Sequence, residues 1–183
     1  VSGTSISFGT PSVFNSTNIG SYTATVYDTN AQKVVVYFED GTNGKGIVGT
    51  VSGTSISFGT AVEFNSGSTQ YIAATYDSTA NKSIVVYRDT GNSSYGTARV
   101  GTVSGTSISF GSEAVFNAGN TEFPAINYDA TSNKSVVFFK DAADSDKGKV
   151  IIGTVSGTSI SFGSEVDVTT GGVFNTAVSS SPS

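Results

Sequence analysis

The stretch VSGTSISFG decides the fold, because it begins at Val1 and recurs almost verbatim at Val51, Val103 and Val155. Successive copies lie 50, 52 and 52 residues apart. Within each copy, Thr-Ser-Ile-Ser-Phe alternates polar and apolar residues, which is the pattern of a half-buried β-strand. A fixed period of this length indicates tandem structural units, so the sequence predicts an all-β protein with units of about 50 residues.

A second block recurs between these copies. It reads YTATVYDTNAQKVVVYFED from Tyr22, YIAATYDSTANKSIVVYRD from Tyr71 and FPAINYDATSNKSVVFFKD from Phe123. The continuously apolar run Ile84-Val85-Val86-Tyr87 predicts a strand that is covered on both faces. Turn chemistry at 77–82 and at Ser104-Gly105 separates the strands. In the second unit we therefore expect four strands, at 71–76, 83–88, 97–103 and 106–116.

Units with four antiparallel strands and both faces covered are typical of β-propeller blades. The predicted fold class is all-β, with tandem four-stranded antiparallel blades forming a partial β-propeller of about three blades per chain. Three blades cannot close a ring, so we expect self-association or a longer parent chain to complete it. The predicted divisions are a leading outer strand at 1–19, blades at 20–69, 70–121 and 122–167, and a C-terminal cap or linker at 168–183.

The composition excludes several classes of function. The net charge is −5 and the pI about 4.5, so the basic stripe that nucleic-acid binding requires is missing. Cys and His are absent, which excludes disulfides, Cys/His metal sites and a Ser-His-Asp triad. No run of 18 apolar residues occurs, so no membrane insertion is expected.

The combination of the two recurring blocks resembles repeat tracts of bacterial surface proteins and of marine phage tail or fibre proteins. The resemblance covers residues 1–167 and implies a β-propeller on a cell or virion exterior that is engaged in attachment. Signatures of better-known blade families are missing: there is no S-x-D-x-G-x-T-W box, no WD dipeptide and no Trp. The resemblance therefore implies none of the enzymatic activities of those families.

Recurring aspartates are the most evident candidates for chemistry. Asp28, Asp77 and Asp129 stand at a hairpin corner, where Asp typically accepts hydrogen bonds from backbone N–H groups of the turn. We interpret them as structural, together with Asp40, Asp89 and Asp141, which close the second strand of each unit. An active site normally uses one asymmetric set of residues, so their repetition predicts a protein that is not an enzyme.

No cofactor is expected, and calcium is the single ion worth considering. Asp144-Ser145-Asp146, with Asp141, forms a local group of oxygen ligands in the third unit. It lacks the Gly and the distal Glu of an EF-hand loop, so the sequence predicts a weak Ca²⁺ site at most.

Positions that vary between units are free to specialise, and they indicate where a ligand would bind. Glu39, Arg88 and Lys140 occupy one equivalent position, at the mouth of a loop that also varies in length. An exposed Tyr95 beside Asn92 would suit sugar stacking and hydroxyl hydrogen bonds. The candidate ligand-binding residues are Glu39, Asn43, Lys45, Arg88, Asn92, Tyr95, Lys140, Asp144 and Lys147.

The functional hypothesis is a non-enzymatic extracellular or virion-surface repeat protein that mediates attachment. Its expected partner is a cell-surface glycan or receptor, bound through the inter-strand loops, and near-identical units favour multivalent binding. One alternative is a purely structural repeat of a fibre or coat. A second alternative is a glycan-cleaving propeller enzyme, which would require a unique pair of carboxylates.

Overall fold

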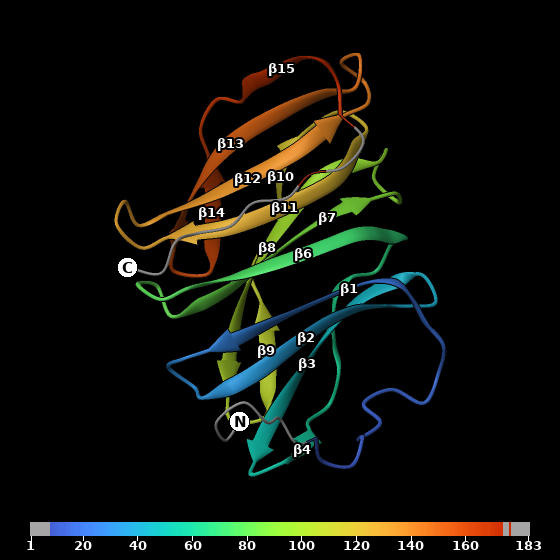
Figure 1. Ribbon diagram of the computed structural model, residues 1–183, viewed down its shortest axis with the longest axis vertical. Coiled ribbons are helices and arrows are strands. Elements are labelled where there is room, and N and C mark those ends of the chain that lie inside the picture. The colour runs from blue at the N-terminus through green and yellow to red at the C-terminus, as the bar shows by residue number, and fades with distance from the viewer. Residues whose placement is uncertain (1–7, 174–175, 177–183) are drawn as a thin grey trace.

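The computed structural model describes residues 8–173 and 176 of the chain. Within this part the protein consists of three antiparallel β-sheets that follow one another along the long axis of the molecule (Figure 1). The same residues form no helix that is long and apolar enough to cross a membrane.

Each sheet contains five strands, and the three sheets repeat the same order of strands. Sheet 1 contains β1 (Ile19–Asp28), β2 (Lys33–Asp40), β3 (Asn43–Ser52), β4 (Ser55–Phe58) and β5 (Val62–Asn65). Sheet 2 contains β6 (Thr69–Asp77), β7 (Lys82–Asp89), β8 (Tyr95–Ser104), β9 (Ser107–Phe110) and β10 (Ala114–Asn117). Sheet 3 contains β11 (Thr121–Asp129), β12 (Lys134–Asp141), β13 (Lys147–Ser156), β14 (Ser159–Phe162) and β15 (Val166–Gly172).

The predicted order of strands is confirmed, but the single fourth strand expected at 106–116 is wrong. The chain forms β9 and β10 there, and both pair with β8. Between them the N–H of Gly111 donates to the carbonyl of Val100 at 2.9 Å. The chain leaves the regular ladder there before β10 pairs with β8. Each unit therefore has five strands instead of four.

The tight turn of each outer hairpin lies one residue later than expected. The register pairs Ser104 with Ser107, so Gly105 and Thr106 form the two-residue loop. Gly105 has a φ of +60°, and a glycine at the first central position is what a type II′ hairpin turn requires.

The expectation that the second strand is covered on both faces is confirmed for sheet 2. Ile84, Val85, Val86 and Tyr87 of β7 are all 0% exposed. Ile84 and Val86 face sheet 3, whereas Val85 and Tyr87 face sheet 1, because alternate strand residues point to opposite faces. Each such side chain contributes roughly 1.5–3 kcal/mol by leaving water, so two packed interfaces hold the three sheets together.

A phenylalanine in the fifth strand of sheets 1 and 2 packs against the next sheet. Phe64 of β5 lies 5.1 Å from Tyr87 and 5.8 Å from Phe110, measured between ring centroids. Phe116 of β10 makes the same contacts with Phe139 and Phe162. Edge and tilted ring geometries of this kind add about 0.5–1.5 kcal/mol to the burial energy.

The two ends of the chain depart from the repeat. Part of the predicted leading strand, 1–7, lies outside the described residues, and 8–18 form no strand. Phe14 nevertheless packs on Phe38 and Phe58 as its counterparts do in the later units. At the other end β15 continues to Gly172, beyond the predicted division at 167.

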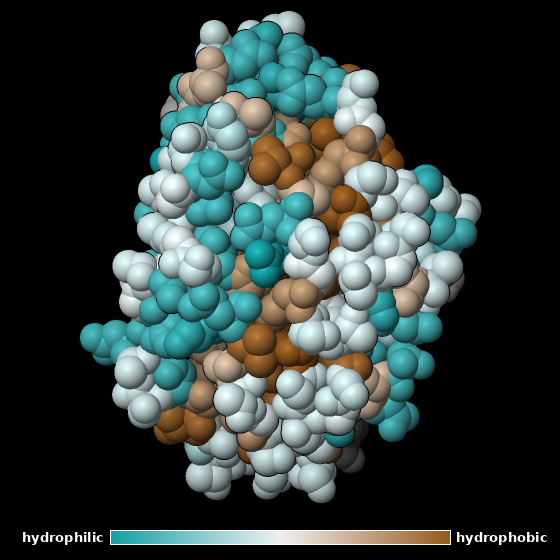
Figure 2. All heavy atoms as spheres, turned by 180° about the vertical axis from the view of Figure 1, so that it is seen from behind, coloured by the Kyte–Doolittle hydropathy of each residue, from teal (hydrophilic) through white to brown (hydrophobic). Residues whose placement is uncertain are grey.

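Apolar side chains also reach the surface. Figure 2 shows hydrophobic groups gathered in the middle of the face opposite to that of Figure 1, with polar groups around them. In sheet 3, Val136 and Phe138 stay half-buried while their counterparts Ile84 and Val86 are fully buried, because no further sheet covers them within the described residues.

Candidate functional site: an aromatic ladder

We call β1, β6 and β11 the inner strands of the three sheets. Their first residues lie at the same end of the sheets as the loops that join the second strand of each sheet to the third. Two backbone hydrogen bonds show this, because Thr69 N–H donates to the carbonyl of Thr42 at 2.9 Å and Thr121 N–H to that of Ser94 at 3.0 Å. Each bond joins the start of one inner strand to the loop of the preceding sheet. Residues from both regions therefore share one surface.

A β-bulge interrupts each inner strand near its start. In β6 the register passes from Gln70 to Ala73 while the partner strand advances by only two residues, so Tyr71 and Ile72 oppose a single residue. Tyr71 has a φ of +51°, and Phe123 at the equivalent bulge of β11 has a φ of +49°. Residues other than glycine rarely adopt this backbone conformation, which costs them roughly 1–2 kcal/mol each.

The bulges bring three aromatic rings into one stack. The ring centroids of Tyr22 and Tyr71 are 4.8 Å apart, and those of Tyr71 and Phe123 are 4.6 Å apart. All three rings are half-buried, and β1, β6 and β11 lie side by side in the front of Figure 1. We call Tyr22, Tyr71 and Phe123 the aromatic ladder.

The aromatic ladder lines a hollow of about 390 Å³, together with Ile72, Pro124 and Thr176. Pro124 follows the bulge residue Phe123 and is tolerated inside a strand because the bulge has no ladder hydrogen bond to lose. Thr176 donates to the carbonyl of Phe123. Strain at Tyr71 and Phe123 therefore coincides with a concave surface, where strained residues tend to serve function.

Charged side chains border the aromatic ladder, and the variable position identified in the sequence supplies Glu39, Arg88 and Lys140 among them. The guanidinium of Arg88 lies 5.7 Å from the centroid of the Tyr71 ring and 3.8 Å from a carboxylate oxygen of Glu122. Lys140 pairs with Glu122 at 3.1 Å and with Asp146 at 2.9 Å.

Glu39 is the charged residue that sheet 1 contributes next to the aromatic ladder. Its carboxylate has no ion pair or hydrogen bond with any other described residue. Burial raises the pKa of Glu39. Burial also raises the pKa of the Tyr22 hydroxyl, with smaller contributions from Tyr71 and from the charge of Glu39.

The structure distributes the candidate ligand-binding residues between two settings. Glu39, Arg88 and Lys140 border the aromatic ladder, as just described. At the start of β3, Asn43 donates to Glu63 at 2.7 Å and Lys45 pairs with Asp40. The remaining candidates are Asn92, which is exposed in its turn, Tyr95, which is half-buried instead of exposed, and Asp144 and Lys147, which belong to an ion-pair cluster.

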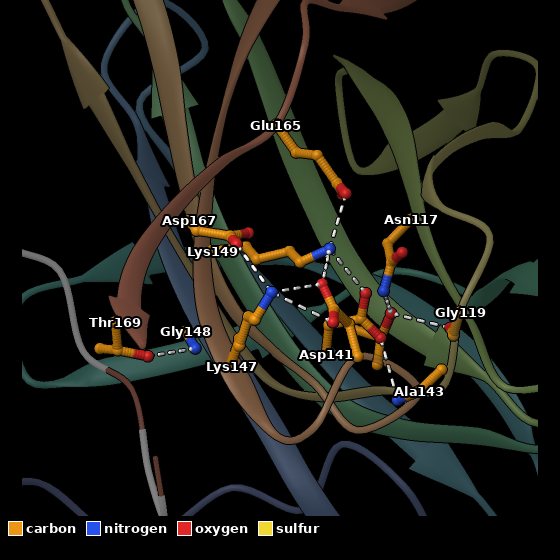
Figure 3. Close-up of polar contacts among 12 residues, drawn as sticks. Asn117, Gly119, Asp141, Ala143, Lys147, Gly148, Lys149, Glu165, Asp167 and Thr169 are labelled. Atoms are coloured by element: carbon orange, nitrogen blue, oxygen red, sulfur yellow. Dashed lines mark hydrogen bonds and ion pairs between the residues drawn. The ribbon is translucent and has the colours of Figure 1, made fainter. Parts of the chain in front are cut away.

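This cluster is centred on Lys149, which is 4% exposed (Figure 3). Its ammonium lies 3.1 Å from Asp141, 3.0 Å from Asp144 and 2.7 Å from Glu165. Burial alone would lower the pKa of Lys149, but the hydrogen bonds that its ammonium donates to the three carboxylates outweigh burial and raise it. Of the three aspartates of the predicted weak Ca²⁺ site, Asp141 and Asp144 thus pair with Lys149, and Asp146 pairs with Lys140. Residues 8–173 contain no group of three or more His, Cys, Asp or Glu side chains that could hold a metal ion.

The structural interpretation of the hairpin-corner aspartates is confirmed. Asp77 accepts hydrogen bonds from the backbone N–H groups of Thr79 and Ala80 at 2.9 and 2.8 Å. Asp28 accepts one from Ala31, and Asp129 accepts one from Thr131. These carboxylates hold turns at the end of the sheets away from the aromatic ladder.

Sequence reasoning missed the aromatic ladder itself. The signal was present, since each second block begins with an aromatic residue at Tyr22, Tyr71 and Phe123. The bulges that turn these rings toward each other leave no mark in the alternation of polar and apolar residues. Comparisons with protein-family models, with curated proteins and with solved structures gave no match to this chain.

Proposed function

We propose that this protein is a non-enzymatic attachment protein that binds a glycan along its aromatic ladder. The observation that carries the proposal is the stack of half-buried rings at Tyr22, Tyr71 and Phe123, two of them held at positive φ. An aromatic face binds the apolar face of a pyranose ring, while surrounding polar groups fix its hydroxyls. A row of three rings suits several consecutive sugars of one chain.

The polar groups around the aromatic ladder support binding rather than hydrolysis. Cleavage of a glycosidic bond needs two carboxyl groups, one on each side of the bond. Glu122 is held by Lys140 and Arg88, which leaves Glu39 as the one carboxylate beside the aromatic ladder without a cationic partner among the described residues. This favours the attachment hypothesis over the glycan-cleaving alternative.

The three sheets are proposed to be consecutive blades of a β-propeller. In support, β1 packs beside β6 and β6 beside β11, which is how the inner strands of neighbouring blades lie, and the other strands of each sheet follow in order from that edge. Further units, from a second copy or from a longer parent chain, would complete the ring. The proposed location is a cell or virion exterior, where several near-identical blades would bind a repeated glycan with avidity.

Binding of the protein to a panel of immobilised glycans, followed by titration of the best ligand, tests the proposal. We expect Tyr71→Ala to weaken binding at least about tenfold, as loss of one stacking ring and its polar tip should. Tyr76→Ala is the matched control, because Tyr76 lies on the same strand but bonds to Asn81 in the hairpin at the opposite end. Absence of any glycan ligand, or unchanged binding by Tyr71→Ala, would favour the purely structural repeat instead.

A further inference from the structure

We infer that the part of the aromatic ladder formed by Tyr22 and Tyr71 selects neutral sugars. Glu39 is the residue that accepts hydrogen bonds from their hydroxyls and repels sugar carboxylates. The inference rests on the proposed function and names the class of glycan that the same site would take.

The position of Glu39 depends on a glycine. A Cβ placed on Gly20 would lie 1.9 Å from the Oε2 atom of Glu39, so the carboxylate occupies the space that a side chain would fill. In sheets 2 and 3 the residues paired with Arg88 and Lys140 are Gln70 and Glu122, and both carry full side chains. Glycine is therefore needed in β1 to let the Glu39 carboxylate lie against the strand, two residues before Tyr22.

The charges near the aromatic ladder do not balance. Arg88 is shared between Glu122 and the Ser94 hydroxyl, and Lys140 is shared between Glu122 and Asp146. Both cations are thus already engaged by carboxylates. Because Glu39 adds a further negative charge near Tyr22 without a partner among the described residues, the carboxylates Glu39, Glu122 and Asp146 outnumber the two cations around the aromatic ladder.

This imbalance discriminates between classes of sugar. A hydroxyl donates readily to a half-buried carboxylate, and such charge-assisted hydrogen bonds are about twice as strong as neutral ones. A uronic or sialic acid would bring a second carboxylate close to Glu39 in a partly desolvated site, where like charges repel strongly. Tyr22 and Tyr71 meanwhile line the hollow with uncharged rings, which can contact the apolar face of a pyranose of either class.

The test compares neutral oligosaccharides with counterparts that carry a carboxylate, on wild type and two variants. Wild type should bind the neutral member of each pair more tightly. Glu39→Gln should weaken neutral binding by about tenfold or more, since a hydrogen bond to a charged group contributes more than a neutral one. Glu39→Lys should reverse the preference toward the carboxylated member.

Two further variants separate the possible outcomes. Gly20→Ala should weaken neutral binding as Glu39→Gln does, because it displaces the carboxylate without changing the charge. Glu63→Gln is the control, since Glu63 is an exposed carboxylate that accepts from Asn43. Equal or tighter binding of carboxylated sugars by wild type, or an unchanged preference in Glu39→Lys, overturns this inference and leaves the proposed function intact. Binding of neither class overturns both.

Discussion

The carbonyl oxygen of Thr158 lies 1.8 Å from the position that a Cβ on Gly111 would occupy. Sheets 2 and 3 therefore touch there through bare backbone. Gly59 meets Thr106 and Gly9 meets Thr54 in the same way, at 1.9 and 1.8 Å. The recurring Gly and Thr of VSGTSISFG are thus the two halves of one contact between successive units.

Gly111→Ala should destabilise the protein by about 1–3 kcal/mol or more, because its methyl group has no room and the sheets must shift. Gly163→Ala is the matched control, since the nearest atom to its Cβ among the described residues is the Ile152 carbonyl oxygen at 3.9 Å. It should be neutral or stabilising by a few tenths of a kcal/mol, through a stiffer unfolded chain. Denaturant unfolding of both variants measures the difference, and equal effects would contradict the close contact.

Tyr37 and Tyr87 should respond in opposite ways to replacement by Phe. The hydroxyl of Tyr37 donates to the hydroxyl of Ser83 across the interface of sheets 1 and 2 at 2.6 Å, and both residues are fully buried. Tyr37→Phe leaves Ser83 with one partner fewer and should cost about 1–2 kcal/mol of unfolding free energy.

The Tyr87 hydroxyl is buried and makes no hydrogen bond of good geometry with the described residues; burial raises its pKa, and nearby Arg99 offsets this only in part. Its counterparts in sheets 1 and 3 are Phe38 and Phe139. Tyr87→Phe removes an unsatisfied buried group, so it should be neutral or stabilising by up to about 1 kcal/mol. Thermal and urea unfolding of the two variants would show whether the order holds, and a larger loss for Tyr87→Phe would refute it.

Tyr71→Gly should be more stable than Tyr71→Ala, which reverses the usual order of these residues in strands. Both variants lose the ring contacts with Tyr22 and Phe123, but only glycine adopts a φ of +51° without strain. The difference should be about 1 kcal/mol in unfolding free energy. At Ala73, which lies in regular strand outside the bulge, replacement by Gly should instead destabilise, and this variant serves as the control.

Acid should release residues 15–17, the leading segment, from sheet 1. Hydrogen bonds from Lys45 first, and then from Thr17, lower the pKa of Asp40 to about 2. A carboxyl whose folded pKa is depressed stabilises the native state above its unfolded pKa, and that stability is lost as the pH falls from about 4 toward 2. Thr17 donates to Asp40 at 2.6 Å and Asn15 at 3.4 Å, so residues 15–17 should detach in this window.

NMR titration of the Asp40 carboxyl, with proteolysis of the leading segment followed as a function of pH, measures both effects. Lys45→Met should raise the pKa of Asp40 and move the release to higher pH. Asp40→Asn should make the accessibility of the segment independent of pH between 2 and 4. Release at the same pH in wild type and Lys45→Met would show that this ion pair is not responsible.

The sequence was sufficient for the features that repeat with a simple period. The copies of VSGTSISFG located the units, the run Ile84–Tyr87 identified the strand covered on both faces, and the Asp residues of the hairpins were correctly interpreted as turn acceptors. These features depend on local hydrogen bonding or on burial, both of which select residue types directly.

The remaining features depend on irregularities that strand periodicity conceals. The break at Gly111 was missed because Gly-Ser-Glu can continue a strand, and only contact with Thr158 requires the glycine. The aromatic ladder was missed because one extra residue at each bulge shifts Tyr71 and Phe123 out of the alternating register. The variable residues Glu39, Arg88 and Lys140 were identified, but the rings they surround were not.

The repeated Gly–Thr contact also bears on how the gene for this chain can change in length. Excision of residues 70–121 would place Gly59 against Thr158 and Phe64 between Phe139 and Phe162, which are the contacts that Gly111 and Phe116 make now. Duplication of a unit would be equally neutral at the joints. Recombination between the nearly identical copies could thus lengthen or shorten the row of aromatic rings without new compensating mutations. Each added or lost unit would bring or remove its own residue at the position of Glu39, Arg88 and Lys140.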